Sequence, residues 1–339
     1  MTMIINTPET LEKKQALLDW AASLKIRVVH IDSTPITSAI RHHLDEDLRN
    51  YWNLALLSRA EKTFPLFAHK AKQHVFRTRV KIERGIETSL KKSIDRKLIQ
   101  LADCFKSTFF SESIKQGLSL RMPLSSCKPT NNCHWSCYAH DGMDAGRYPI
   151  IKGAINGVIA RLYETGTQEQ KHSILSLLRR PTTLAIKRAM AESKRAGFKR
   201  DPRIRFSHVG EIAEFPKFSN AFAKLVKDLS EDKVRCVVYT RHNNAKLLDS
   251  DLFVVNFTLD RDSEERMEWV PTNARKVFTA WDGECESSVA VNFLEHHRFS
   301  HAKIKGAGHV CPVTIPETTF KTCDSAKCDL CFTKTEREI

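Results

Sequence analysis

Residues 203–259 read RIRFSHVGEIAEFPKFSNAFAKLVKDLSEDKVRCVVYTRHNNAKLLDSDLFVVNFTL, and this stretch decides the fold class. It contains three strand-like runs, over 203–209, 234–240 and 252–259, and an amphipathic segment with helical spacing over 216–229. The runs VVYT and FVVNF are apolar almost throughout, which is typical of strands that are covered on both faces of a sheet. The stretch therefore predicts parallel βα units.

The same alternation continues on both sides of this stretch. Further strands are expected at 118–122 and 276–281, helices at 149–165, 168–179, 182–196 and 216–229, and shorter helices at 243–248 and 272–275. We therefore expect an α/β fold whose parallel strands form a complete or partial βα barrel.

The N-terminal part of the sequence has a different pattern. Residues 8–22 and 35–109 have helical spacing, and residues 25–32 alternate like a short strand. We predict a basic, mainly helical N-terminal region (1–112), an α/β barrel-like domain (113–305) and a Cys-rich C-terminal metal-binding segment (306–339).

Charge is the first indication of function. The 339 residues are 41% hydrophobic and 28% charged, which excludes disorder as the dominant state, and the net charge is +14. Residues 61–100 contain 11 basic and 4 acidic side chains, and residues 171–205 contain 11 and 2. This distribution favours a polyanionic partner such as nucleic acid, and solvated helix faces are the alternative.

The sequence contains neither an export signal nor an apolar run of about 18 residues that could span a membrane. We therefore expect a cytoplasmic protein without a membrane partner. In a reducing compartment, clustered cysteines are more often metal ligands than disulfides.

The first cysteine cluster directly follows the predicted strand 118–122. It reads SSCKPTNNCHWSCYAHDG, with Cys127, Cys133 and Cys137 in C-x5-C-x3-C order. Three thiolates after a parallel strand can hold a metal with one coordination position open. With His134 or His140 as a fourth ligand the same cysteines would form a closed zinc site, and inert buried thiols are the third interpretation.

The second cluster lies near the C-terminus. Cys311, Cys323, Cys328 and Cys331 follow one another in C-x11-C-x4-C-x2-C order. Four cysteines suit tetrahedral zinc and an iron–sulfur cluster equally well. Redox chemistry of the dithiol Cys328 and Cys331 is an alternative.

Cysteines that follow the first barrel strand, and a later strand that ends in Val209-Gly210-Glu211 before a helix, resemble the pattern of the radical SAM enzymes. The resemblance implies that Cys127, Cys133 and Cys137 bind a [4Fe–4S] cluster and that Gly210 and Glu211 contact the amino group of S-adenosylmethionine. It also implies an auxiliary cluster at the C-terminal cysteines. The family's usual cysteine spacing is C-x3-C-x2-C, and Val209 replaces the first glycine of its usual Gly-Gly-Glu turn.

A second resemblance covers roughly residues 115–335. The segments Cys137-Tyr138-Ala139, Tyr239-Thr240-Arg241, Cys311-Pro312 and Cys328 to Cys331 resemble the gene product 88-like family of phage and plasmid proteins. This resemblance implies a protein of a mobile genetic element and lends it no defined activity.

Other polar residues also follow apolar strands. Arg241 and His242 can bind an anionic substrate or a cofactor carboxylate, or they mark a capped helix start. Asn256, Thr258 and Asp260 share one face by strand alternation. The sequence lacks HExxH, GxxxxGK[ST] and GxGxxG motifs.

These patterns lead to two hypotheses. The first is a metal- or iron–sulfur-binding, radical SAM-like enzyme that acts on or near nucleic acid, with Gly210, Glu211 and Arg241 as cofactor contacts. The second is a non-enzymatic nucleic-acid-binding protein with zinc at both cysteine clusters, serving replication or maintenance. The side chains expected to contact phosphates are Arg77, Arg79, Lys81, Arg84, Lys91 and Lys92.

Overall fold

The structure is a computed structural model that describes most of the chain from residue 47 to residue 294. The described residues are 47–58, 65–113, 117–135, 137–140, 142–196, 200–272, 274–280, 289, 291–294, 311, 326–327 and 331. The expected elements at 8–22 and 25–32 lie outside this set, as do Cys323, Cys328 and the side chains of Lys91 and Lys92. No helix within these residues combines the length and the apolar character needed to cross a membrane.

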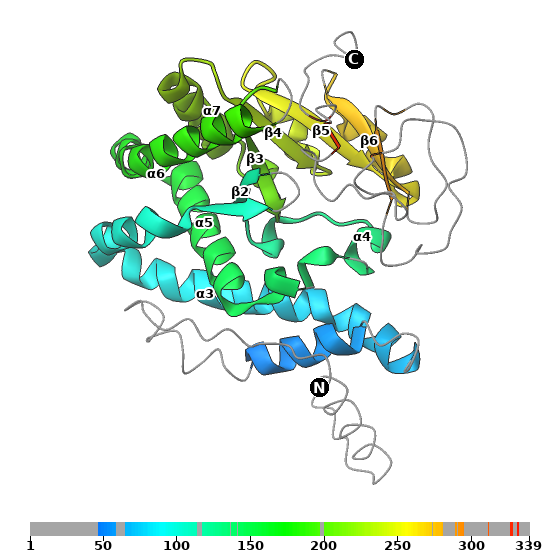
Figure 1. The fold of residues 1–339 in the computed structure, drawn as a ribbon. Coiled ribbons are helices and arrows are strands. Elements are labelled where there is room, and N and C mark those ends of the chain that lie inside the picture. The colour runs from blue at the N-terminus through cyan, green and yellow to red at the C-terminus, as the bar shows by residue number, and fades with distance from the viewer. Residues whose placement is uncertain are drawn as a thin grey trace. The chain divides into compact units, whose positions relative to one another are not determined.

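The elements follow one another along the chain in α/β order (Figure 1). After a helix at 47–58, the α-helices are α3 (Pro65–Thr108), α4 (Asn131–Trp135), α5 (Arg147–Thr165), α6 (Gln168–Arg195) and α7 (Pro216–Ser230). The strands are β1 (Phe110–Ser113), β2 (Gly117–Arg121), β3 (Arg203–Val209), β4 (Arg235–Thr240), β5 (Phe253–Leu259), β6 (Arg275–Ala280) and β7 (Val291–Leu294). Short 3-10 helices are η1 (Leu124–Ser126), η2 (Tyr138–His140), η3 (Gly142–Ala145), η4 (Ile212–Glu214), η5 (Asn243–Leu247) and η6 (Arg261–Trp269).

The seven described strands form one sheet in sequence order, from β1 to β7. β1 is antiparallel to β2, and every later pair of neighbours is parallel. The mixed α/β class and the five strands predicted between residues 118 and 281 are confirmed. β1 and β7 were not predicted, because four residues each are too few to establish a strand period.

Helices pack on one face of the sheet through aromatic side chains. On α7, Phe222 lies edge-to-face against Phe109, with ring centroids 5.2 Å apart, and 5.4 Å from Phe206 of β3. Phe206 in turn contacts Phe253 of β5 at 5.1 Å. Each fully buried phenylalanine contributes about 2–3 kcal/mol of transfer free energy, so this cluster anchors α7 on the sheet.

The opposite face of the sheet contacts the C-terminal cysteines. Val237, Val254 and Val277 lie on three neighbouring strands and form one buried cluster with Cys311 and Cys331. The two cysteines are 20 positions apart in sequence, so the C-terminal segment returns to the sheet at both of them.

One boundary prediction was wrong, since α6 is a single helix where two were expected, at 168–179 and 182–196. Pro181 lies inside the helix, and its missing N–H removes one backbone hydrogen bond. The buried stripe continues on both sides of it, from Leu178 to Ala185, and packing keeps the helix continuous. The expected short helix at 272–275 is also absent, because Thr272 lies in a turn and Arg275 begins β6.

The chain divides into two compact units. The three predicted regions, 1–112, 113–305 and 306–339, stay predictions. The first unit comprises Met1–Ile82 and Cys137–Pro149, and the second comprises Glu83–Ser136 and Ile150–Ile339. The sheet and the polar site described below belong to the second unit.

A buried polar network holds the first unit together. The hydroxyl of Tyr51 lies 3.0 Å from His140 Nδ1 and accepts a hydrogen bond from Arg79 Nη1 at 3.2 Å. Arg79 also donates to the carbonyl of Asp144, and Trp52 Nε1 donates to the carbonyl of Ala145. Arg79 is 1% exposed, so its guanidinium serves the interior of this unit.

Candidate functional site

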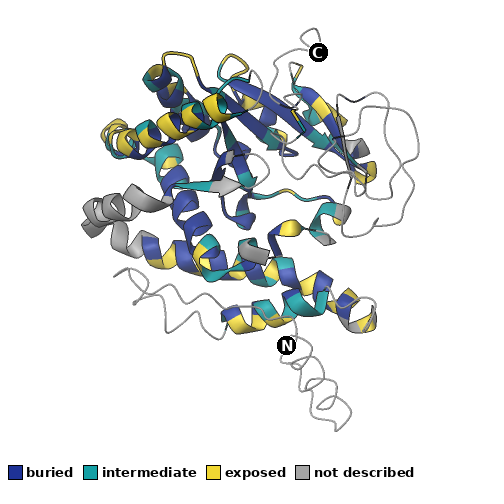
Figure 2. Cartoon of the chain, viewed as in Figure 1, coloured by how far each residue is buried: buried dark blue, intermediate teal, exposed yellow. Residues whose placement is uncertain are grey.

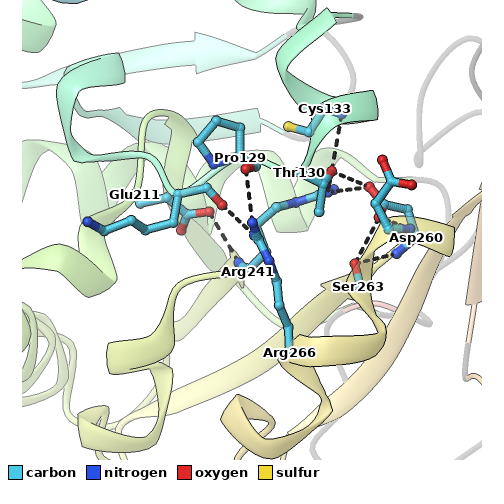
Figure 3. Close-up of polar contacts among 10 residues, drawn as sticks. Pro129, Thr130, Cys133, Glu211, Arg241, Asp260, Ser263 and Arg266 are labelled. Carbon is cyan, nitrogen blue, oxygen red and sulfur yellow. Dashed lines mark hydrogen bonds and ion pairs between the residues drawn. The ribbon is translucent and has the colours of Figure 1, made fainter.

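The polar site lies where four neighbouring parallel strands end. The loop after β2 carries Thr130 and Cys133, the turn after β3 carries Glu211, Arg241 follows β4, and Asp260 follows β5 (Figure 3). The carboxyl ends of parallel strands are where α/β folds place their functional residues.

A tight turn brings the end of β3 against the loop after β2. Ser207 and Gly210 both have positive φ, at 72° and 75°, and Ser207 Oγ accepts a hydrogen bond from the backbone N–H of Ile212 at 2.6 Å. A Cβ at Gly210 would lie 2.5 Å from the carbonyl oxygens of both Met122 and Pro123. Only glycine permits this close approach, which places Glu211 at the loop.

Glu211 is buried, and only one of its carboxylate oxygens is paired within the described chain. Its backbone N–H donates to Ser126 Oγ at 2.8 Å, and its Oε1 accepts from the backbone N–H of Arg241 at 3.2 Å. Its Oε2 is fully shielded from solvent and has no hydrogen-bond partner among the described residues. Burial raises the pKa of Glu211 to about 7, against the opposing effect of hydrogen bonds from Thr240 and Arg241.

Arg241, Asp260 and Thr130 form a compact triad beside Glu211. Arg241 Nη1 lies 2.7 Å from Asp260 Oδ2, and Thr130 Oγ1 donates to the same oxygen at 2.6 Å. The Asp260 side chain is 0% exposed and that of Arg241 is 10% exposed. Such a buried ion pair persists because each remaining lone pair of the carboxylate also has a donor.

The other oxygen of Asp260 caps η6. Asp260 Oδ1 accepts from Ser263 Oγ at 2.8 Å and from the backbone N–H of Asp262 at 3.1 Å. From the last turn of η6, Arg266 donates to the backbone carbonyls of Lys128 and Pro129. This capping motif therefore ties the segment after β5 to the cysteine loop after β2.

The cysteine loop presents two thiols in the second unit. Cys127 and Cys133 are both partly buried, and the backbone N–H of Cys133 donates to Thr130 Oγ1 at 3.2 Å. Burial raises the pKa of the Cys133 thiol, and the charge of Arg241 opposes this shift. Cys137 is also partly buried and belongs to the first unit.

Metal binding at these cysteines remains a prediction. Within the described residues, no three His, Cys, Asp or Glu side chains gather closely enough to hold a metal ion. In the C-terminal cluster, Cys311 and Cys331 are buried together, and the carbonyl of Cys331 accepts from Asn256 Nδ2 at 3.0 Å. Cys323 and Cys328 lie outside the described residues, so the four-cysteine site is not tested.

His242 has a structural role at the start of η5. Its Nδ1 accepts from the backbone N–H of Asn244 at 3.0 Å, and its Nε2 lies 2.9 Å from Glu214 Oε2. This geometry matches the capped helix start that was one of two interpretations for Arg241-His242. Burial lowers the pKa of His242, and Glu214 opposes this shift.

The residues predicted to contact phosphates lie on α3. Arg77, Lys81 and Arg84 are exposed, whereas Arg79 is buried in the network around Tyr51. Arg79 therefore does not present its charge to an external partner in this structure.

Comparisons with known proteins add no assignment. No protein-family model matches the chain, and neither curated proteins nor solved structures yield a similar protein. The resemblances to radical SAM enzymes and to the gene product 88-like family therefore stay predictions.

The pH dependence of stability should reveal the cost of charging Glu211. The unfolded chain releases this proton near pH 4.5 and the folded chain near pH 7, so the folded state binds more protons between these values. The free energy of unfolding should therefore fall as the pH rises through this window, by about 3 kcal/mol from this group alone. Glu211→Gln should remove this loss and be more stable than the wild type at pH 8.

Chemical denaturation of both proteins at pH 4.5 and pH 8 measures the effect. Lys152, whose pKa burial lowers to about 7, titrates in both proteins, so the difference between them isolates Glu211. If Glu211→Gln were less stable than the wild type at pH 8, the prediction would be wrong. The negative charge of the carboxylate would then be stabilised by groups outside the described residues.

Proposed function

We propose that the carboxyl edge of the sheet is the cofactor site of a metal- or iron–sulfur-dependent enzyme, and that it binds the amino acid end of S-adenosylmethionine. The observation that carries this proposal is Glu211 Oε2, a shielded carboxylate oxygen without a partner in the described chain, at the end of a parallel strand. A structural carboxylate such as Asp260 has donors on both oxygens, and Glu211 lacks this pattern.

A ligand ammonium group suits the unpaired oxygen. It would donate to Glu211 Oε2 and favour the charged carboxylate, offsetting the burial that raises the pKa of this group. Arg241 has five N–H donors, of which Nη1 serves Asp260 and Thr130. Its other donors suit a ligand carboxylate, so the pair matches the two charged groups of an amino acid.

The thiols fit a metal centre in their chemistry. Cys127 and Cys133 lie on the loop that Ser126 and Thr130 fix beside Glu211 and Arg241. The cysteine spacing and the radical SAM resemblance supply Cys137 as the third ligand. When bound, the cluster would supply the electron for cofactor cleavage, and the chain would bind and orient the cofactor.

The winding of the sheet supports the barrel interpretation. From β2 to β7 each strand is followed by its spatial neighbour, so the order never reverses. Doubly wound sheets reverse their strand order at a switch point, whereas barrels wind in one direction. We infer that the sheet is part of an α/β barrel.

Anaerobic reconstitution followed by cofactor binding tests the proposal. The protein should take up iron and sulfide and gain an absorption band at about 400 nm. The reconstituted protein should also bind S-adenosylmethionine, as measured by calorimetry. Glu211→Gln should weaken that binding at least about tenfold, in line with removal of one charge-assisted hydrogen bond. Lys217→Gln, at an exposed position on α7, is the matched control and should bind normally. Uptake of zinc alone, without cofactor binding, would end the enzyme proposal.

Zinc uptake would instead support the second candidate, a zinc-stapled nucleic-acid-binding protein of a mobile genetic element. The observation in its favour is the basic surface of α6. Its six exposed Lys and Arg side chains could contact phosphates without a bound cofactor. Metal analysis of the purified protein separates the two candidates.

A further inference from the structure

The outward face of α6 carries a concentrated positive charge. Between Glu169 and Glu192 the sequence contains no acidic residue, so the middle of α6 is purely basic in its charged side chains. Six cations occupy exposed positions between residue 179 and the end of the helix: Arg179, Arg180, Lys187, Arg188, Lys194 and Arg195. We refer to these six residues as the α6 basic face.

The cations recur as adjacent pairs with helical spacing. The pairs begin at residues 179, 187 and 194, so successive pairs are 8 and 7 positions apart, close to two helical turns. At 1.5 Å per residue the pairs repeat about every 11–12 Å and together span about 24 Å. A single helix therefore displays the three pairs in a row along its exposed side.

The rest of α6 is fixed against its own unit. Its other face is buried and contacts α7, β2 and β3, so the basic face is oriented outward (Figure 2). The buried side chains include Ile174, Leu178, Ala185, Ile186 and Ala189. No folding step is needed to assemble the row of charges.

We propose that the α6 basic face binds the phosphodiester backbone of nucleic acid. Duplex DNA carries one negative charge per about 1.7 Å of axis when both strands are counted, so about 24 Å of duplex carries on the order of 14 phosphates, of which the row meets those on the facing side. Leu184 is the one large apolar side chain exposed on the described part of α6, and the helix's apolar stripe is buried, so no face is left to insert into a lipid surface. Phosphate contacts of this kind position a nucleic acid without reading its sequence.

The proposal does not depend on the sheet-edge site. The basic residues lie on a helix surface, whereas the proposed cofactor contacts follow β3 and β4. Failure of S-adenosylmethionine binding would leave this surface in place, and failure of nucleic-acid binding would leave the cofactor proposal in place.

A charge-matched pair of full-length variants tests the proposal. The test variant combines Arg179→Gln, Arg180→Gln, Lys187→Gln and Lys194→Gln. The control combines Lys217→Gln, Lys224→Gln, Lys246→Gln and Lys276→Gln, four exposed lysines on α7, η5 and β6. Both variants remove four charges, and all eight positions are exposed, so thermal unfolding should show both folded.

Fluorescence anisotropy with labelled duplex DNA, single-stranded DNA and RNA of about 20 nucleotides, at increasing KCl, gives the readout. The test variant should bind at least about tenfold more weakly at about 100 mM KCl. Its slope of log Kd against log salt should fall by up to about 3.6, which is about 0.9 for each of the four phosphates that are no longer neutralised. The control should keep most of the wild-type slope. Comparison of the three probes identifies which backbone form binds best.

Three results would overturn the proposal. Equal weakening of both variants would show that only net charge matters, and unchanged binding of the test variant would exclude this face. If anionic lipid vesicles bound through these four residues while all three nucleic acids did not, the surface would be a membrane contact.

Discussion

Replacement of Asp260 by asparagine should lower the free energy of unfolding by about 3–5 kcal/mol. The change leaves the buried guanidinium of Arg241 without its counterion, and removal of one partner from a buried ion pair costs this much. It also weakens an acceptor for Thr130, and with it one link between the loops after β2 and β5. Urea denaturation at pH 7 measures the loss.

A double-mutant cycle shows whether the loss belongs to the pair. Arg241→Met alone should also destabilise the protein, because it leaves the Asp260 carboxylate buried without its cation. The double variant should be more stable than the sum of the two single changes by about 2 kcal/mol, as expected for groups in direct contact. Strict additivity would mean that the 2.7 Å contact between Arg241 and Asp260 contributes nothing, and the site geometry would then need revision.

The sheet was largely predictable from local sequence. β4 and β5 contain apolar runs whose residues prefer strands, and both of their faces are largely buried, so local preference and final environment agree. β7 has only four residues, and its place depends on pairing with β6. Pairing between distant segments leaves no local period that could have indicated it.

The polar site was predictable only in part. Arg241 was predicted because it directly follows a predicted strand, and Glu211 because its Gly-Glu turn resembles that of the radical SAM enzymes. Thr130 did not, since its partner Asp260 is 130 positions away and threonine in a loop is ordinary. From the sequence, Asp260 was predicted only to share one face of a strand with other polar residues. In the structure Asp260 and Ser263 form a capping box at the start of η6, the helix that carries Arg266. A capping residue at this position could have been recognised in the sequence.

The exposure of the basic residues on α3 was also predictable only in part from the sequence. Arg77, Lys81 and Arg84 are exposed, and Arg79 falls on the buried stripe with Val75, Ile82 and Ile86. Helical periodicity by itself places Arg79 near that stripe, but its burial requires Tyr51 and Asp144, which come from other segments. A count of charges over a window therefore overestimates the surface available to a polyanion.

Gly210→Ala should destabilise the protein by about 3 kcal/mol or more and abolish binding at the sheet edge. A non-glycine residue at φ 75° costs about 1–2 kcal/mol, and the added Cβ would lie 2.5 Å from two backbone carbonyl oxygens. Those oxygens, of Met122 and Pro123, begin the cysteine loop, so they cannot move without displacing it. Relief of the overlap costs a further 1–3 kcal/mol, roughly as for other overpacked sites.

Gly85→Ala, in the same unit, should change the stability in the opposite direction. Gly85 is exposed on α3, and a Cβ there meets no atom within 4 Å. Because alanine favours the helix over glycine by up to about 1 kcal/mol, this variant should be slightly more stable than the wild type. Thermal unfolding of both variants should give shifts of opposite sign. A Gly210→Ala protein as stable as Gly85→Ala would mean that the turn does not press against the loop, and the juxtaposition of Glu211 with the cysteines would lose its structural basis.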